Sequence, residues 1–391
     1  MNLNTDFIPF ARPSIGTEEE QAVLKVLRSG WLTTGIETKS FEEEFAAFTD
    51  TANALAVNSA TSGLHLVLEA FGVGPGDKVI TSPYTFTSTA EVIRYLGADP
   101  VFADIDPETF NISPLETAKL LEKDPSIKGI IPIHIAGHPC DMNALLELKK
   151  KYNIFILEDA AHAFPVKYNG KFLGSIGDAG VFSFYATKTI TTGEGGMIVT
   201  NNETAAKRMS TMRLHGIDRE IWDRYTSDKP GWQYSIVDAG FKYNMPDILA
   251  ALGREQLKKA YMFLEKRKGI ANFYFKRFKD LDFLRLPEKH KNHGWHLFMP
   301  RIIPEKLTIS RDLFIQELIS KGIGISVHFI PLHIMPYYKN KYGYDESDYP
   351  ETLKAYNSVF SLPIYPDLTE DQLEKIVSAV IDTGVKFRRK F

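Results

Sequence analysis

The sequence predicts an α/β protein with a large domain built on a mainly parallel sheet and a smaller second domain. Between residues 50 and 200, short β-rich runs alternate with stretches that carry apolar residues at three- and four-residue spacing. This alternation is typical of strands joined by crossover helices. After residue 245 the pattern changes to a long helical segment, followed by a second set of alternating elements. The length of 391 residues suffices for two or three domains.

An N-terminal helix is expected from Thr17, because Glu20 follows it at the spacing of a capping box. Its buried stripe would consist of Ala22, Val23, Val26 and Leu27.

The large domain should contain seven strands and the helices between them. The strand candidates are Ala54–Asn58, Lys78–Thr81, Pro100–Ala103, Gly129–Ile133, Ile154–Leu157, Gly180–Ser183 and Gly196–Thr200. The helix candidates are Ser62–Phe71, Thr87–Leu96, Pro114–Glu122 and Met142–Tyr152.

A boundary near residue 260 divides the chain into a large domain, residues 1–260 with the N-terminal segment, and a small C-terminal domain, residues 261–391. In the second part, strands are expected at His296–Ile302 and Gly324–Phe329, and helices at Ser310–Lys321 and Glu370–Val380.

Composition excludes several classes of protein. Hydrophobic residues make up 44% and charged residues 24%, and 46 Lys and Arg against 49 Asp and Glu leave a net charge of −3, so disorder is excluded as the main state. Without a basic excess, neither nucleic acid nor a membrane is an expected partner. A single cysteine, Cys140, cannot form an intrachain disulfide. We expect a cytoplasmic protein without a spanning helix.

Polar residues directly after strands are the first candidates for chemistry, because ligands of open α/β sheets collect at the carboxyl ends of strands. Glu158, Asp159 and His162 follow one buried strand. A helix cap with an incidental histidine is the alternative interpretation.

Lys188 lies between an apolar strand and the glycine-rich segment Thr191–Gly196. Partial burial there would lower the pKa of its amine and allow it to form a Schiff base. A solvated loop lysine is the alternative.

A third signal is the run Asn58–Gly63, in which a strand leads into small hydroxyl residues that open a helix. Backbone N–H groups there, with the Thr61 and Ser62 hydroxyls, can hold a phosphate. Plain N-capping accounts for the same residues equally well.

These features, together with the aromatic segment Pro83–Phe86, match the needs of pyridoxal phosphate. The cofactor requires a lysine, a carboxylate at the ring nitrogen, a phosphate site and a stacking aromatic ring.

No metal site is predicted. Gly137 and Pro139 would break the helix that His134 and His138 need in order to act as ligands together. A turn would place His290, His293 and His296 on different faces.

The ordered motifs resemble those of the DegT/DnrJ/EryC1/StrS family of pyridoxal-phosphate-dependent sugar-nucleotide aminotransferases, and the resemblance covers nearly the whole chain. The motifs are Ser29–Gly35, Glu158–Ala163, Gly174–Gly180, Phe182–Phe184, Lys188, Thr191–Gly196, Arg213–Gly216, Tyr243–Met245 with Asp247, Val327–His333 and Ser361–Pro363.

The resemblance implies a role for each matching residue. Lys188 would be the Schiff-base lysine and proton shuttle, and Asp159 would bind the ring nitrogen. Phe86 would stack on the ring, with His162 near the ring hydroxyl. The phosphate would be held by Ala60, Thr61, Ser62 and Ser183.

The resemblance also implies the aspartate-aminotransferase fold, which is fold type I of these enzymes, and a homodimer with shared active sites. Many members have an asparagine where this chain has Lys242, and that asparagine reaches the phosphate in the neighbouring subunit. Lys242 could replace it with a positive charge.

The implied reaction is transfer of an amino group from L-glutamate to a keto group of a nucleotide-linked deoxysugar. The segment Trp31–Thr34, His162 and Lys242–Asn244 resemble enzymes that act at C4. Candidate substrate residues are Trp31, Thr33, His215, Arg219, His328 and Phe329. The alternatives are an aminotransferase for 3-keto sugars and a non-catalytic, cofactor-binding regulatory protein of the same fold.

Overall fold

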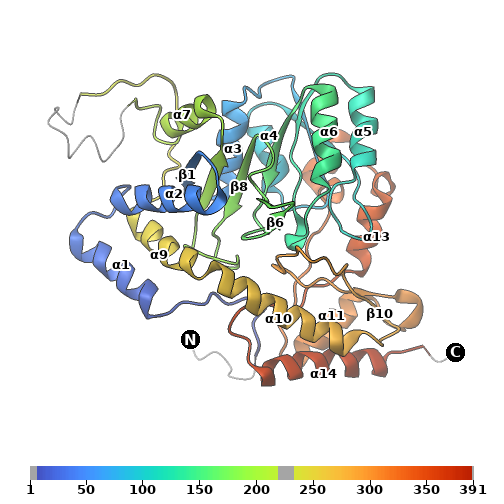
Figure 1. The fold of residues 1–391 in the computed structure, drawn as a ribbon. Helices are drawn as coiled ribbons and strands as arrows, with labels where there is room; N and C mark the ends of the chain where they lie inside the picture. The colour runs from blue at the N-terminus through green and yellow to red at the C-terminus, as the bar shows by residue number, and fades with distance from the viewer. Residues whose placement is uncertain (1–6, 219–232, 390–391) are drawn as a thin grey trace.

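The computed structural model describes residues 7–218 and 233–389, and these fold around a central seven-stranded sheet (Figure 1). Its strand order is β1-β9-β8-β5-β4-β2-β3. Strand β9 runs antiparallel to both neighbours, and the other adjacent pairs are parallel, so the expected mainly parallel sheet is confirmed. The strands are β1 (Asn53–Val57), β2 (Lys78–Thr81), β3 (Asp99–Phe102), β4 (Ile127–Ile130), β5 (Phe155–Asp159), β8 (Ala179–Ser183) and β9 (Gly196–Thr200).

Helices cover both faces of this sheet and form most of the C-terminal part. They are α1 (Thr17–Ser29), α2 (Ile36–Thr49), α3 (Ala60–Ala70), α4 (Ser88–Tyr95), α5 (Pro114–Lys123), α6 (Met142–Tyr152), α7 (Glu203–Met212), α9 (Asp247–Lys258), α10 (Ala260–Phe278), α11 (Arg311–Ser320), α12 (Pro336–Tyr342), α13 (Pro350–Ser358) and α14 (Glu370–Lys386). Two short ribbons pair β6 (Lys167–Tyr168) with β7 (Lys171–Phe172) and β10 (Leu284–Arg285) with β11 (Arg301–Ile302).

Alternate residues of the strands bury opposite faces of the sheet, as the two-residue period of a strand requires. Val181 and Ile198 belong to a core shared with α3, α4 and α7. Their neighbours Phe182 and Met197 belong to a second core shared with α2, α6 and α9. The central strands are therefore apolar on both faces, which explains their nearly continuous hydrophobic sequence.

Two glycines allow helix α3 to lie close against the sheet. A Cβ at Gly63 would lie 2.8 Å from Cγ1 of Val181, and one at Gly196 would lie 2.7 Å from the backbone nitrogen of Ala60. Any side chain at either position would push the helix away. Close packing thus places the first turn of α3 beside the start of β9.

The C-terminal part has its own apolar core between α10, α11 and α14, which includes Tyr274, Phe314 and Val377. The chain near the N-terminus joins it, because the Ile8 N–H donates to the Gly322 carbonyl over 2.8 Å. Helix α10 contributes to this core and to the core under the sheet. The domain division at residue 260 stays a prediction.

Some expected boundaries were wrong. Helix α1 begins at Thr17, so its cap is Gly16, whose N–H donates to Glu19 over 2.9 Å. Leu27, expected to be buried, is 50% exposed. The expected strand at 324–329 forms only an isolated bridge between Ser326 and Ser361. A short apolar run does not by itself distinguish a strand from other buried backbone.

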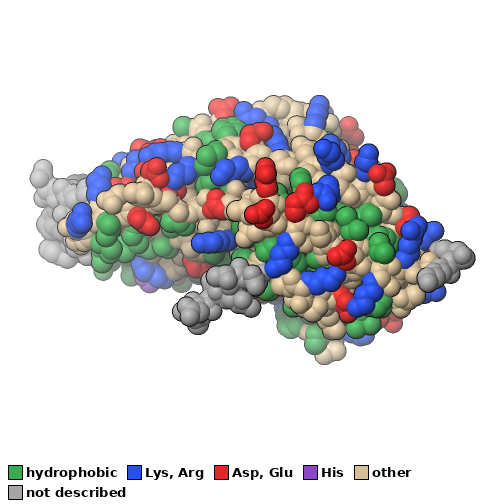
Figure 2. Space-filling view, turned by 90° about the horizontal axis from the view of Figure 1, so that it is seen from below, with side chains coloured by type: hydrophobic (Ala, Val, Ile, Leu, Met, Phe, Trp, Pro, Cys, Tyr) green, Lys and Arg blue, Asp and Glu red, His purple; other side chains and the backbone are tan. Residues whose placement is uncertain are grey.

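Figure 2 shows positive and negative side chains interspersed over the face seen from below. Hydrophobic side chains gather at the end of this face where Figure 1 places α1. Within residues 7–218 and 233–389, no helix combines the length and apolar character needed to cross a membrane.

Asp247 joins two helices that are distant in sequence. Its buried carboxylate, at the start of α9, accepts hydrogen bonds from the N–H of Gly35 at 2.7 Å and from the N–H and hydroxyl of Thr38 at 3.0 and 2.7 Å. These groups belong to the first turn of α2, where backbone donors have no partner within the helix. The carboxylate thereby fixes α2 against α9.

We expect Asp247→Ala to lower the free energy of unfolding by about 3 kcal/mol, because it leaves buried donors unpaired. Urea denaturation would measure the change. Asp280→Ala is the control, since that side chain is 86% exposed, and its effect should stay below about 0.5 kcal/mol. Equal effects of the two substitutions would contradict the structural role of Asp247.

Candidate active site

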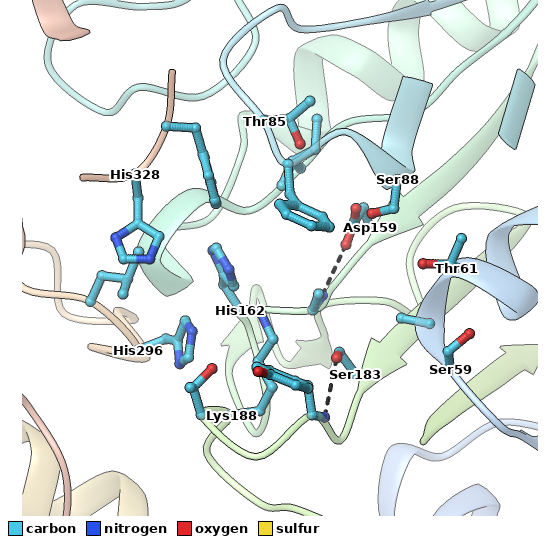
Figure 3. Close-up of a pocket in the computed structure, with 18 of the residues that line it drawn as sticks. Ser59, Thr61, Thr85, Ser88, Asp159, His162, Ser183, Lys188, His296 and His328 are labelled. Carbon is cyan, nitrogen blue, oxygen red and sulfur yellow. Dashed lines mark hydrogen bonds between the residues drawn. The ribbon is translucent and has the colours of Figure 1, made fainter. Parts of the chain in front are cut away.

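A cavity of about 570 Å³ opens at the carboxyl ends of the parallel strands (Figure 3). Its walls include the segments that follow β1, β2, β5 and β8. In an open α/β sheet these ends lie along one edge, so residues from distant parts of the sequence converge there. The volume is in the range of pockets that bind small molecules.

Lys188 reaches this cavity from the turn that follows β8. Burial lowers the pKa of its amine to about 8, although the nearby Asp159 carboxylate favours the charged form. A substantial share of the amine is therefore neutral near physiological pH, and a neutral amine is the nucleophilic form. The expectation of a partly buried lysine with a lowered pKa is confirmed.

The adjacent acids Glu158 and Asp159 have different roles. Glu158 is fully buried and accepts hydrogen bonds from the N–H groups of Gly174, Ile176 and Gly177, at 2.8, 2.7 and 2.6 Å. It holds a loop and does not line the cavity. Asp159 points to the opposite face, into the cavity, as successive side chains of a strand do.

Two hydrogen-bond donors orient the Asp159 carboxylate. The hydroxyl of Thr89 donates to Oδ2 over 2.8 Å, and the N–H of Ala161 donates to Oδ1 over 3.1 Å. Burial raises the pKa of Asp159, and these two hydrogen bonds and the positive charge of Lys188 oppose that shift. Such a carboxylate favours a cation or a charged N–H group as its neighbour.

The first turn of α3 forms another wall of the cavity. Ser59 caps the helix by accepting the Ser62 N–H over 3.1 Å, and Ser59, Ala60 and Thr61 line the cavity. The Ser62 hydroxyl bonds instead to Asn58 and Ser59, so the residue supports the turn from behind. Both interpretations of the sequence therefore apply, because the residues that cap the helix also present donors to the cavity.

His162 is neutral and its tautomer is determined by the backbone. The Ala136 N–H donates to its Nδ1 over 3.3 Å, which leaves the proton on Nε2. Burial, with the charge of Lys188 and the proximity of His328, holds its pKa well below the usual value. The ring lies between His296, at a centroid distance of 4.4 Å, and Phe329, at 5.9 Å.

The structure brings nine of the expected residues to the cavity wall. They are Ala60, Thr61, Phe86, Asp159, His162, Ser183, Lys188, His328 and Phe329.

Other expected residues lie elsewhere. Lys242 and His215 are exposed outside the cavity, and the indole N–H of Trp31 donates to the Thr34 carbonyl over 3.3 Å. Thr33 is also exposed, and Arg219 lies outside the described residues. Their roles stay predictions.

Sequence reasoning missed several residues of the cavity wall, including Ser59, Thr85, Ser88, Tyr185, Thr187, Glu194 and His296. A signal existed for Ser59, which belongs to the same hydroxyl-rich run as Thr61. The sequence places His296 at the start of an expected strand and in an evenly spaced series with His290 and His293, and neither feature predicts a place at the active site. Nothing in the sequence indicates that its loop crosses to the end of β5.

The comparisons with known proteins agree with this geometry. A sequence model of the DegT/DnrJ/EryC1/StrS aminotransferase family matches residues 13–381. The chain belongs to this family. It is 44% identical over 379 residues to the spore coat polysaccharide biosynthesis protein SpsC of Bacillus subtilis, a match that covers 96% of this chain and 97% of that protein.

Solved structures show the same relationship. Helicobacter pylori PseC, an aminotransferase involved in the biosynthesis of pseudoaminic acid, superposes with a TM-score of 0.91 at 30% identity, over 98% of this chain and 100% of that one. The PLP form of Spr1654, a putative sugar aminotransferase from Streptococcus pneumoniae, gives 0.88 at 33% identity, over 97% and 99%. The protein is a sugar aminotransferase that depends on pyridoxal phosphate.

The residues of the cavity fit this cofactor. Lys188 supplies an amine with a lowered pKa, Asp159 supplies a buried carboxylate suited to a ring N–H group, and the first turn of α3 supplies donors for a phosphate. Phe86, 60% exposed at the cavity wall, offers a face for stacking. When bound, the cofactor carries the amino group and accepts the electrons released at the reacting carbon.

In the cofactor-free protein, acylation of Lys188 by acetic anhydride should rise with pH and reach half its maximum near pH 8, since the amine is neutral above its pKa. Ordinary lysines titrate near 10.4. Pulse labelling and peptide mass spectrometry would follow Lys188 against the exposed Lys171. Identical pH profiles for the two lysines would contradict the lowered pKa.

Proposed function

We propose that the enzyme transfers an amino group from L-glutamate to the C4 keto group of a nucleotide-linked deoxysugar. The products are the aminosugar nucleotide and 2-oxoglutarate. The observation that carries this proposal is that the Lys188 amine and the Asp159 carboxylate line one cavity, between the hydroxyls at the start of α3 and the histidines, whose space can hold a substrate.

Each residue contributes a defined part of the chemistry. The Nζ atom of Lys188, with a pKa of about 8, can accept a proton and return it at neutral pH. Asp159, held by Thr89 and Ala161, stabilises positive charge on the group beside it. The rings of Phe86 and Phe329, with centroids 6.4 Å apart, provide apolar surface next to the reacting groups.

Relatives support a sugar as the acceptor, since SpsC is named for polysaccharide biosynthesis and PseC for the biosynthesis of pseudoaminic acid. The choice of C4 rests on the resemblance of Trp31–Thr34, His162 and Lys242–Asn244 to enzymes that act at that position. A 3-keto acceptor remains the alternative. The presence of both Lys188 and Asp159 argues against a purely regulatory protein.

The visible absorbance of the holoenzyme tests donor and acceptor separately. We expect L-glutamate to convert the spectrum to that of the aminated cofactor, and a 4-keto nucleotide sugar to restore it, whereas a 3-keto sugar should not. Restoration by the 3-keto sugar alone would overturn the choice of C4. Lys188→Ala should abolish turnover and leave a folded protein, because the proton carrier is lost.

We also propose that the enzyme is a homodimer with shared active sites. Apolar side chains on and after α1 are exposed in the single chain, among them Leu27 at 50%, Leu32 at 44% and Ile36 at 50%. Exposed apolar groups of this kind are typical of surfaces that a partner covers. Two residues after Lys242, the Asn244 side chain donates to the Thr34 hydroxyl over 2.7 Å, in the segment between Leu32 and Ile36. Lys242 is exposed and does not line the cavity of its own chain, so we assign it to the phosphate site of the partner.

Mixed dimers test this assignment. If Lys242 acts across the interface, a Lys188→Ala chain paired with a Lys242→Ala chain should form one intact site and recover activity that neither variant has alone. If Lys242 acts within its own chain, the mixed dimer has no intact site. Co-expression with two affinity tags, followed by an activity assay, distinguishes these cases, and absence of recovery in a correctly assembled dimer rejects the shared site.

A further inference from the structure

Three histidines form one wall of the cavity. Figure 3 shows His162, His296 and His328 on one side, with Ser59 and Thr61 on the opposite side beyond Asp159. The hydroxyl side is suited to the phosphate of the cofactor. The histidine wall therefore faces the space that is left for substrates.

The structure holds His296 rigidly at this wall. Its N–H donates to the Ala136 carbonyl over 2.9 Å. The buried guanidinium of Arg267, on α10, donates to the carbonyls of His296, Trp295 and Ile364 at 3.2, 3.3 and 2.6 Å. These hydrogen bonds hold the backbone of His296 from two directions, as a residue that binds a ligand requires.

His296 lines the cavity, and its two ring nitrogens differ in their surroundings. Nδ1 is enclosed and has no hydrogen-bond partner among the described residues. An enclosed N–H without an acceptor costs more than an unpaired lone pair on a neutral ring, so the proton belongs on Nε2. Burial, with His162, Lys188, Arg267 and His328 nearby, holds the pKa of His296 well below its usual value. The ring is a neutral N–H donor.

The charges of the cavity indicate what this donor binds. Among the described residues of its wall, Lys188 is the only lysine or arginine, and the cofactor engages it. An amino donor such as glutamate brings carboxylates into the same space as the carboxylates of Asp159 and Glu194. Those substrate carboxylates need hydrogen-bond donors, and the histidine wall, at a distance from the phosphate side, supplies them.

We propose that His296 is a substrate-binding residue that donates a hydrogen bond from Nε2 to a carboxylate of the amino donor. The proposal rests on the proposed function in that it assumes an amino-acid donor. In this proposal a neutral imidazole, and not a lysine or arginine, binds the substrate carboxylate. His328, whose Nδ1 lies 2.8 Å from the Ser361 hydroxyl, forms the adjacent part of the wall.

A second role for His296 must be separated from this one. Its ring stacks on that of His162, with centroids 4.4 Å apart and planes inclined by 34°, so it could act only by packing. Two substitutions distinguish hydrogen bonding by His296 from packing of its ring. His296→Gln keeps an N–H donor and loses the ring, whereas His296→Phe keeps the ring and loses the donor.

The binding of glutarate to the holoenzyme, measured by calorimetry, is the test. Glutarate has the carbon chain and both carboxylates of glutamate but no amino or keto group to react. We expect His296→Phe to weaken binding about tenfold or more, and His296→Gln to stay within about threefold of the wild type. His290→Gln is the matched control, since His290 does not line the cavity, and should leave binding unchanged.

The reverse order, with Phe tolerated and Gln impaired, would overturn the proposal in favour of packing. Unchanged glutarate binding in both variants would also overturn it. Should His296→Phe not fold, His296→Ala replaces it as the variant without a donor. In kinetics, the KM for the amino donor should rise in His296→Phe while the KM for the sugar stays constant.

Failure of the proposed function gives a different result. If another amino acid converts the cofactor spectrum and glutamate does not, the donor identity is wrong. The His296 variants are then tested with the matching deaminated acid. If glutamate reacts normally and the Gln and Phe variants bind glutarate as the wild type does, the function stands and the role of His296 is rejected.

Discussion

The burial of one amine and one carboxylate at the same edge of the sheet is the constraint on which this site depends. Asp159 ends β5 and Lys188 lies in the turn after β8, and these two adjacent strands are parallel, so their carboxyl ends lie together. Loss of water lowers the pKa of the amine and raises that of the carboxylate, and each charge partly offsets the shift of the other. The Lys188 amine can therefore accept and return a proton, and the Asp159 carboxylate can stabilise positive charge, because the sheet keeps both groups out of bulk water.

This arrangement requires that the surrounding backbone be held in fixed positions. Glu158, next to Asp159, holds a loop on the opposite face of the strand through three backbone donors. Gly63 and Gly196 allow α3 to approach the sheet, so that the turn opened by Ser59 faces the cavity. On the far side, Arg267 holds the loop of His296. The functional side chains are thus positioned by buried polar contacts and close packing that take no direct part in the chemistry.

The two ends of the cavity have different chemistry. The end near α3 offers hydroxyls and backbone donors, which suit a phosphate, and the other end offers neutral imidazoles. Neutrality there follows from burial and from the charge of Lys188. Apart from Lys188, the described residues of the cavity wall include no lysine or arginine that could bind a substrate carboxylate. A neutral N–H group forms its stronger hydrogen bond with a carboxylate and places no fixed positive charge opposite the sugar.

The sequence by itself determined the alternation of strands and helices, the places where polar residues follow strands, and the ordered motifs that carry the family resemblance. These are local properties, since the period of apolar residues and the residues at strand ends can be read within short windows. Only the tertiary structure decided that Glu158 supports a loop while Asp159 faces the cavity, that Ser62 lies behind Ser59, and that His296 reaches the site. Each of these depends on contacts between segments far apart in the chain, such as that of Arg267 with the His296 carbonyl, which no local pattern encodes.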